Sequence, residues 1–339
     1  MRGSLILRGA LLVTLCILVL WSMSGDGERA VRDFFHIPSS GTITILTHPV
    51  PVLPPHTHRA DQEGVDSLFD AGHGVTVTSD VLVTKEDVWI TGIQNIANNA
   101  PASVLHHLLL QQVGTRDAYC ANRPSELAVI GSDTDYKLSL PPPYGLFVPK
   151  GTRLYLSGML HNPLPKAGPG KTYTDVSFGF RITYETNNPR RSVRMYYQRL
   201  NLDEGVHCED GPGSTGSQDD RFTVPAGKQD FVFSSRTASS SDPGRYTFTK
   251  PGLVFLEGGH LHESEGGKKI DLFLNDKLLH TIVPQRAPVA WNKLEVTTFR
   301  VRPGDTLSIE ATYSNPFPFP IRDAMGIVGF LYAPDPETL

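Results

Sequence analysis

The sequence predicts an all-β fold: two tandem antiparallel β-sandwiches of a jelly-roll-like kind, placed after an N-terminal hydrophobic segment. Two observations carry this prediction. Short apolar stretches alternate with polar residues along most of the chain, and this two-residue period is typical of half-buried strands. The 31 glycines and 27 prolines among 339 residues suit many short strands joined by turns, and no long helical periodicity follows the N-terminus.

The N-terminal segment, residues 1–25, is expected to be a signal peptide or a membrane anchor. Arg2 and Arg8 precede or flank an apolar run over residues 10–21, which is as long as a signal-peptide core and short for a membrane span. No small-residue cleavage motif is evident after it, so a cleaved signal and a single uncleaved anchor both stay open. Either one places the rest of the chain outside the cytoplasm, secreted or membrane-anchored.

Three segments follow, and turn residues mark their limits. Residues 26–70 are expected to be loop-rich, residues 71–188 to form the first sandwich domain, and residues 189–339 to form the second. The joint is expected at Asn187, Asn188 and Pro189. The strands are expected at 75–78, 81–83, 88–90, 104–110, 154–160, 176–184, 193–197, 222–224, 231–234, 252–256, 270–274, 277–282, 294–300, 306–312 and 325–332, with a tight hairpin at Asn275 and Asp276.

Charge and motifs exclude several functions. The net charge of −4 and a pI near 6.3 argue against nucleic acid as a partner, because phosphate binding needs a clustered positive surface. A G-x-S-x-G nucleophile motif is absent from the sequence. Beyond the N-terminal segment only Cys120 and Cys208 remain; they permit one disulfide in an oxidising compartment, and two unpaired thiols fit as well.

His106 and His107 are adjacent inside a strongly apolar strand pattern, Val-Leu-His-His-Leu-Leu-Leu. Successive strand side chains point to opposite faces, so one metal ion can take both only through a local bulge or twist, or through different ring nitrogens. One core histidine beside one surface histidine is the alternative.

His260 and His262 occupy alternate positions of an expected strand, so both imidazoles can meet one ion, although a solvent-facing pair has the same spacing. His161 ends another strand, and Met325 begins the last one; each alone suits an ordinary structural role. Together, several imidazoles and one thioether favour copper. Imidazole binds copper in both oxidation states and thioether favours Cu(I), whereas zinc seldom takes methionine.

From about residue 75 to the C-terminus, the order of these elements resembles the type II, ascorbate-dependent copper monooxygenases, which include the peptidylglycine- and dopamine-hydroxylating enzymes. The resemblance implies two copper ions per chain. It assigns the first ion to His106, His107 and His161, and the second ion, together with the catalytic role, to His260, His262 and Met325.

The activity implied is hydroxylation of a C–H bond of a small substrate with O₂ and ascorbate. In the family, the methionine site binds O₂ and attacks the substrate, while the all-histidine site stores an electron and passes it across a solvent-filled cleft. Two other classes stay open. A non-catalytic extracytoplasmic copper carrier could work with one site, and in a structural or adhesive sandwich the histidines would be incidental.

The sequence also departs from the peptidylglycine enzyme. Glu257 and two glycines stand where that enzyme has a basic residue, and Ile327 and Gly329 replace its aromatic and amide substrate contacts. A peptide ending in glycine is therefore not expected, and a small neutral or hydrophobic substrate is.

Other polar residues are weaker candidates. His56 and His58 form a second alternating pair, which suits a solvated loop or an accessory metal contact. Asp271, Glu263 and Glu265 could orient imidazole N–H groups, or could be solvated surface residues.

Overall fold

A computed structural model describes residues 39–52, 75–116, 124–130, 137–160, 171–188, 193–202, 223–237, 244–261, 266–283, 291–321, 324 and 326–336. Within these ranges the chain forms strands and one 3-10 turn, η1 (Ala102–Val104), so the predicted all-β class is confirmed. Apart from one parallel pair, neighbouring strands run antiparallel.

The largest sheet runs through both halves of the chain. Its strand order is β1 (Ser39–Leu46), β11 (Tyr173–Thr186), β5 (Val88–Asn98), β9 (Tyr144–Val148), β12 (Val193–Asn201), β20 (Gly326–Pro334), β15 (Gly252–Leu261) and β18 (Trp291–Val301), with β2 (Val50–Val52) on β11 and β8 (Lys137–Ser139) on β5.

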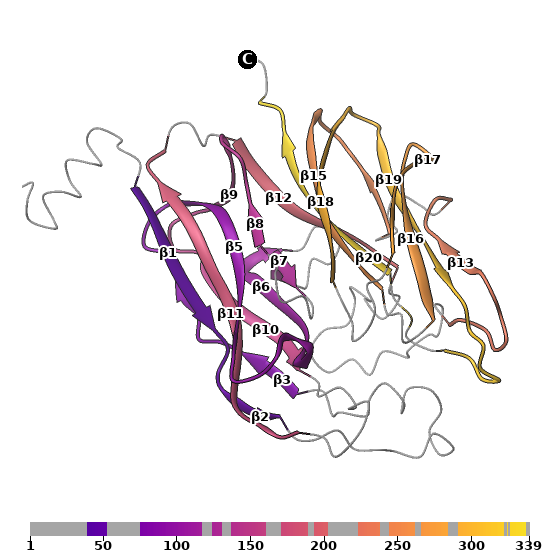
Figure 1. The fold of residues 1–339 in the computed structure, drawn as a ribbon. Coiled ribbons are helices and arrows are strands. Elements are labelled where there is room, and N and C mark those ends of the chain that lie inside the picture. The colour runs from indigo at the N-terminus through magenta and orange to yellow at the C-terminus, as the bar shows by residue number, and fades with distance from the viewer. Residues whose placement is uncertain are drawn as a thin grey trace, which may run out of the picture.

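Two smaller sheets each cover one half of this large sheet, so two sandwiches lie side by side (Figure 1). The first consists of β3 (Val75–Thr78), β10 (Arg153–Leu160), β6 (Leu105–Arg116) and β7 (Pro124–Ile130), with β4 (Leu82–Val83) on β10. The second consists of β13 (Phe231–Ser234), β19 (Thr306–Tyr313), β16 (Gly267–Leu274) and β17 (Lys277–Ile282), with β14 (Arg245–Thr247) on β19.

A parallel pair, β9 with β12, joins the two halves. Its register places Val193 opposite Tyr144 and Met195 opposite Leu146. On its other edge β12 pairs antiparallel with β20, so the chain enters its second half as a strand of the same sheet. Strand alternation predicts that β12 exists, but it does not show which strands β12 joins.

Each half has its own hydrophobic core, and the second half contributes to both. Met195, Phe255, Leu331 and Ala333 come from β12, β15 and β20, yet they are buried in the first core. The ring of Phe255 stands edge-on to Tyr144 of β9, with centroids 4.9 Å apart. The second core lies on the opposite face of β15 and β20, where Val254 and Phe330 belong to it. These strands are therefore packed on both faces.

Residues 39–52 differ from the loop-rich expectation. β1 pairs with β11 along its whole length, and its Thr-Ile-Thr-Ile pattern has the strand period. A Cβ on Gly179 would lie 2.0 Å from the carbonyl oxygen of Ile45, so β1 approaches β11 here as only glycine permits. The hairpin expected at Asn275 and Asp276 is confirmed, since both have positive φ, 50° and 63°, between β16 and β17.

Asn315 organises the chain between β19 and β20. Its side chain is fully buried, and its amide nitrogen lies within 2.8–3.2 Å of the carbonyl oxygens of Val224, Pro225 and Phe319. Its Oδ1 accepts a hydrogen bond from the N–H of Phe317 at 2.9 Å. One side chain thus satisfies several backbone groups that water reaches poorly.

Replacement Asn315→Ala should lower the free energy of unfolding by about 2–5 kcal/mol, because each buried polar group that loses its partner costs about 1–3 kcal/mol. Chemical denaturation followed by circular dichroism measures the change. Asn98→Ala is the matched control, since Asn98 donates one partly buried hydrogen bond to Ser177, and it should cost clearly less. Equal losses in the two variants would contradict this role of Asn315.

Candidate metal centre

Strand β6 contains the bulge that joint metal binding by His106 and His107 requires. In the pairing of β10 with β6, Met159 lies opposite His107, and the next residue, Leu160, lies opposite Leu105. His106 is therefore the extra residue of a β-bulge.

This bulge keeps both histidines out of the first core. Leu105 and Leu108 are both fully buried in that core although they are three residues apart, and strict alternation would place them on opposite faces. The extra residue, His106, returns the side chain of Leu108 to the core side of β6. His106 and His107 are half-buried, and their ring centroids lie 5.0 Å apart.

A second bulge occurs in β15, just before the histidine of that strand. Leu256 lies opposite Phe330 and Gly258 lies opposite Gly329, so Glu257 is the extra residue relative to β20. The side chain of Glu257 is buried. A bulge shifts the alternation of every residue that follows it.

The shift decides where His260 points. Leu256 and Leu261 both belong to the second core although five residues separate them, which the inserted residue makes possible. His260 therefore lies on the opposite face of β15, the face toward the first half. Its partner on β20, Ile327, packs against the first core. Without the bulge, His260 would face the second core.

His106 and His260 consequently meet where the two halves adjoin. Their ring centroids are 6.2 Å apart and the rings are nearly perpendicular, at 80°. His260 is 5% exposed. Because a metal–imidazole nitrogen bond is about 2 Å long, two imidazoles on one ion have centroids about 5–6 Å apart. The separation of His106 from His107 has this size, and that of His106 from His260 lies just above it.

The three other expected ligands, His161, His262 and Met325, lie outside the described residues. Their sequence neighbours are described, however. Leu160 pairs with Leu105, and Leu261 pairs with Gly326. Among the described residues alone, three or more His, Cys, Asp or Glu side chains do not gather into a complete ligand set.

The carboxylate of Asp271 is hydrogen-bonded to residues other than these histidines. Its two carboxylate oxygens accept hydrogen bonds from Lys269 and Thr281, each 2.6 Å long, on β16 and β17. The remaining sequence candidates fall outside the described residues: Glu263, Glu265, His56, His58, Cys120, Cys208 and the segment 1–25. In the part that is described, no helix is both long and apolar enough to cross a membrane.

Comparisons with known proteins show no relative by sequence: neither a family model nor a curated protein matches this chain. Among solved structures, the chain is similar to the major capsid protein P2 of bacteriophage PM2, with 6% identity over 88% of this chain and 99% of that one, at a TM-score of 0.30. The PBCV-1 virus capsid matches with 8% identity, 88% and 95% coverage and a TM-score of 0.27. A fucolectin from striped bass, Morone saxatilis, matches with 12% identity, 88% and 97% coverage and a TM-score of 0.17. Such scores carry no information about activity.

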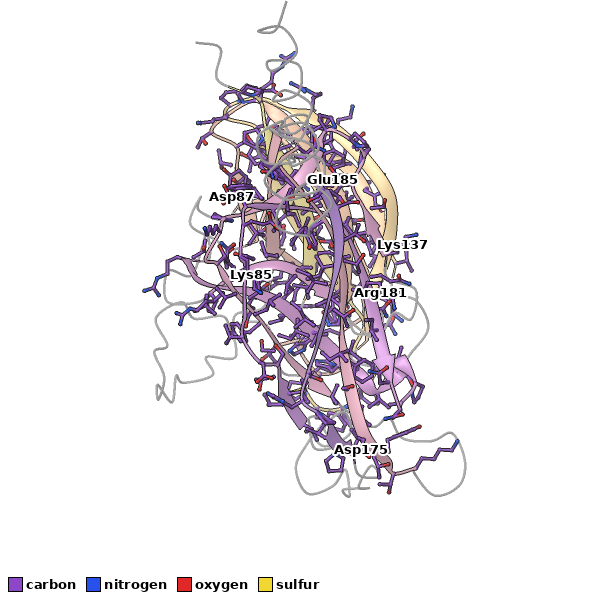
Figure 2. The ribbon with its side chains drawn as sticks, turned by 90° about the vertical axis from the view of Figure 1, so that its left-hand side faces the viewer. Lys85, Asp87, Lys137, Asp175, Arg181 and Glu185 are labelled. Atoms are coloured by element: carbon purple, nitrogen blue, oxygen red, sulfur yellow. The ribbon has the colours of Figure 1, made fainter. Side chains whose placement is uncertain are left out.

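A separate polar hollow of about 240 Å³ lies on the outer face of the large sheet. Arg181, Gln94 and Lys137 face it from three neighbouring strands, since Gln94 pairs with each of the other two. Figure 2 shows Lys137 and Arg181 close together at that face. Because Ile182 points into the first core, Arg181 points away from it, so the first core separates this hollow from the small sheet that carries His106.

Gly158 sits directly behind the first bulge. A Cβ at this position would lie 2.5 Å from the carbonyl oxygen of His107 and 2.9 Å from a methyl group of Leu108. Strand β10 thus packs against the bulge more closely than any side chain at Gly158 allows.

Replacement Gly158→Ala should push β10 from the bulge and lower the free energy of unfolding by about 1–3 kcal/mol; if copper binds at the bulge, it should also weaken that binding. Denaturation and copper titration measure the two effects. Gly92→Ala in β5 is the matched control, since its Cβ would meet nothing closer than 3.3 Å. Copper affinity that stays at the wild-type value in Gly158→Ala would contradict a metal site at the bulge.

Proposed function

We propose that the protein is a copper-dependent monooxygenase, which hydroxylates a C–H bond of a small substrate with O₂ and a reductant such as ascorbate. One oxygen atom enters the C–H bond, and the other is reduced to water with two electrons and two protons from the reductant. The observation that carries the proposal is that two independent bulges turn His106 and His260 out of their cores and bring them within 6.2 Å.

The donor chemistry of these residues fits copper. His106, His107 and His260 offer imidazole nitrogens, which suit copper in both oxidation states. Copper, when bound, would supply the redox chemistry that O₂ requires. The protein's own contribution is to hold the imidazoles on hydrogen-bonded strands, of which β15 is packed on both faces. The two ligand sets that the resemblance implies are His106, His107 and His161, and His260, His262 and Met325.

Strand pairing supports both sets. Leu105 and Leu160 are paired, and each directly precedes an expected ligand of the first set in the sequence. Leu261 and Gly326 are paired, and they adjoin the expected ligands His262 and Met325. The described strands that adjoin each expected set in the sequence are therefore hydrogen-bonded to each other.

The surroundings of His260 favour an uncharged substrate. On its face of β15 and β20, the neighbouring positions are Gly258, Gly329 and Ile327. None of these three carries a charge, and two have no side chain, so they leave space beside the imidazole. The residue next to them in the sequence, Glu257, is acidic, so it offers no positive charge to a substrate carboxylate. We infer a small neutral or hydrophobic substrate.

We further propose that the protein works outside the cytoplasm, secreted or anchored by residues 1–25. This rests on the basic and apolar pattern of that segment.

A non-catalytic copper carrier is the second candidate. The observation that favours it is the same short separation of His106 and His260, because ligands that converge can hold a single ion, and a carrier could function with one. Turnover separates the two functions.

The copper-loaded protein should consume O₂ with ascorbate when a suitable neutral substrate is present, and ¹⁸O₂ should place one ¹⁸O atom in the product. His260→Ala should lower this rate by more than about 100-fold. Loss of a residue that only hydrogen-bonds to a metal ligand costs about 10–100-fold in activity, and loss of the ligand itself should cost at least as much. His280→Ala is the control, since His280 lies on β17 in the outer sheet of the second half.

The assay screens small neutral and hydrophobic compounds, with a peptide ending in glycine as the negative comparison. Copper binding without substrate-dependent O₂ uptake across the screen would favour the carrier. Turnover of the glycine peptide would overturn the inferred substrate class.

A further inference from the structure

The polar hollow on the outer face of the large sheet has the side chains of an anion-binding site. We propose that it binds a small hydroxylated organic oxyanion, such as a sugar acid or a sugar phosphate, with the oxyanion held between Arg181 and Lys137. The hollow is independent of the proposed copper chemistry, because the first core separates it from the small sheet that carries His106.

Two basic side chains flank one amide in this hollow. Arg181 of β11 and Lys137 of β8 both pair with Gln94 of β5, so the three residues form one row across three strands. Neighbouring strands lie about 4.8 Å apart, which places the two basic residues roughly 10 Å apart. Their long side chains lie close together in Figure 2. Like charges at this distance repel one another, and an anion between them would turn the repulsion into two attractions.

The lining of the hollow provides no acid to neutralise these cations. Apart from Arg181 and Lys137, the residues that line it are uncharged. Within the described part of the chain, neither cation makes an ion pair. Glu185 lies four residues beyond Arg181 on β11, about 13 Å along the strand, and its carboxylate accepts a hydrogen bond from Asn188. The local charge is therefore positive, opposite to the net charge of −4, and attracts anions.

The next row of the same three strands offers hydroxyl groups and space. Thr183 and Ser139 flank Gly92 there. A Cβ on Gly92 would lie 3.3 Å from the carbonyl oxygen of Leu138 and 3.6 Å from the Cβ of Thr183, so the missing side chain leaves the floor of the hollow open. The guanidinium fork of Arg181 matches a carboxylate or a phosphate, and the two hydroxyls can bond to ligand hydroxyls.

A bulge in β5 bends the sheet at this hollow. Relative to β11, Thr91 is the extra residue between Ile90 and Gly92. The carbonyl oxygen of Thr91 accepts a hydrogen bond of 2.8 Å from the N–H of Leu140, where the chain leaves β8. Bulges bend a strand and are frequent beside binding sites. The volume of about 240 Å³ is slightly below the roughly 300–1,000 Å³ of pockets for drug-sized ligands, so one molecule of sugar size suits it.

The test measures ligand binding to the full-length protein by isothermal titration calorimetry at low ionic strength. The probes form two matched pairs, glucose 6-phosphate with inorganic phosphate and glucuronate with acetate, and glucose is the neutral comparison. At least one sugar anion should bind more tightly than its small partner, because its hydroxyls add contacts, and more tightly than glucose, because it carries a charge. The tighter sugar anion identifies the oxyanion.

Replacements Arg181→Gln and Lys137→Gln should each lower the affinity for that sugar anion about 10-fold or more, because each removes a charge-assisted hydrogen bond. Thr183→Val should lower it about 3-fold and leave the affinity for the small partner unchanged. Lys85→Gln is the matched control, since it removes one positive charge from an exposed lysine that does not line the hollow. Arg181 and Lys137 are exposed, so melting temperatures should stay at the wild-type value and show that the variants fold.

Three results would overturn the inference. The first is that neither sugar anion binds. The second is that Lys85→Gln weakens binding as much as Arg181→Gln and Lys137→Gln do, because total charge would then explain the effect. The third is that phosphate and acetate bind as tightly as their sugar partners, which would remove the hydroxylated ligand.

Discussion

The parallel pairing of β9 with β12 is the contact on which the rest of the structure depends. It continues the sheet of the first half into the second, so β20 and β15 follow in the same plane. These strands then present one face to each core, and Phe255 and Leu331 are buried in a core built mostly by the other half. Two sandwiches joined only by a flexible linker would leave the relative position of His106 and His260 undefined. Here backbone hydrogen bonds and apolar burial define it.

The bulges resolve a conflict between packing and ligand placement. In a regular strand, the residues that alternate with buried leucines are fixed by position, and an imidazole that fell on the core side would be costly to bury. Inserting one residue moves the histidine to the other face and leaves the leucines on both sides in their core. β6 does this at His106 and β15 does it at Glu257, three residues before His260. The cost is a local loss of regular pairing at each bulge.

The sequence predicts what is local and misses what depends on distant partners. Alternation predicts the all-β class, and the pair Asn275 and Asp276 predicts its hairpin, because positive φ suits these residues. The need for a bulge at His106 and His107 also follows from adjacent residues. The bulge at Glu257 had a signal, the odd spacing between Leu256 and Leu261, but it becomes informative only when both are known to share a core. The partners of β12 could not be predicted, since strand pairing is set by residues far apart in the sequence.

The separation of the two histidines depends on packing between the halves. The ring of Phe255 on β15 stands against Tyr144 of β9, and Phe255 is buried in the first core five residues before His260. Loosening this contact would move His260 relative to His106 without touching either imidazole. The packing that stabilises the fold is therefore also what sets the distance between the two histidines.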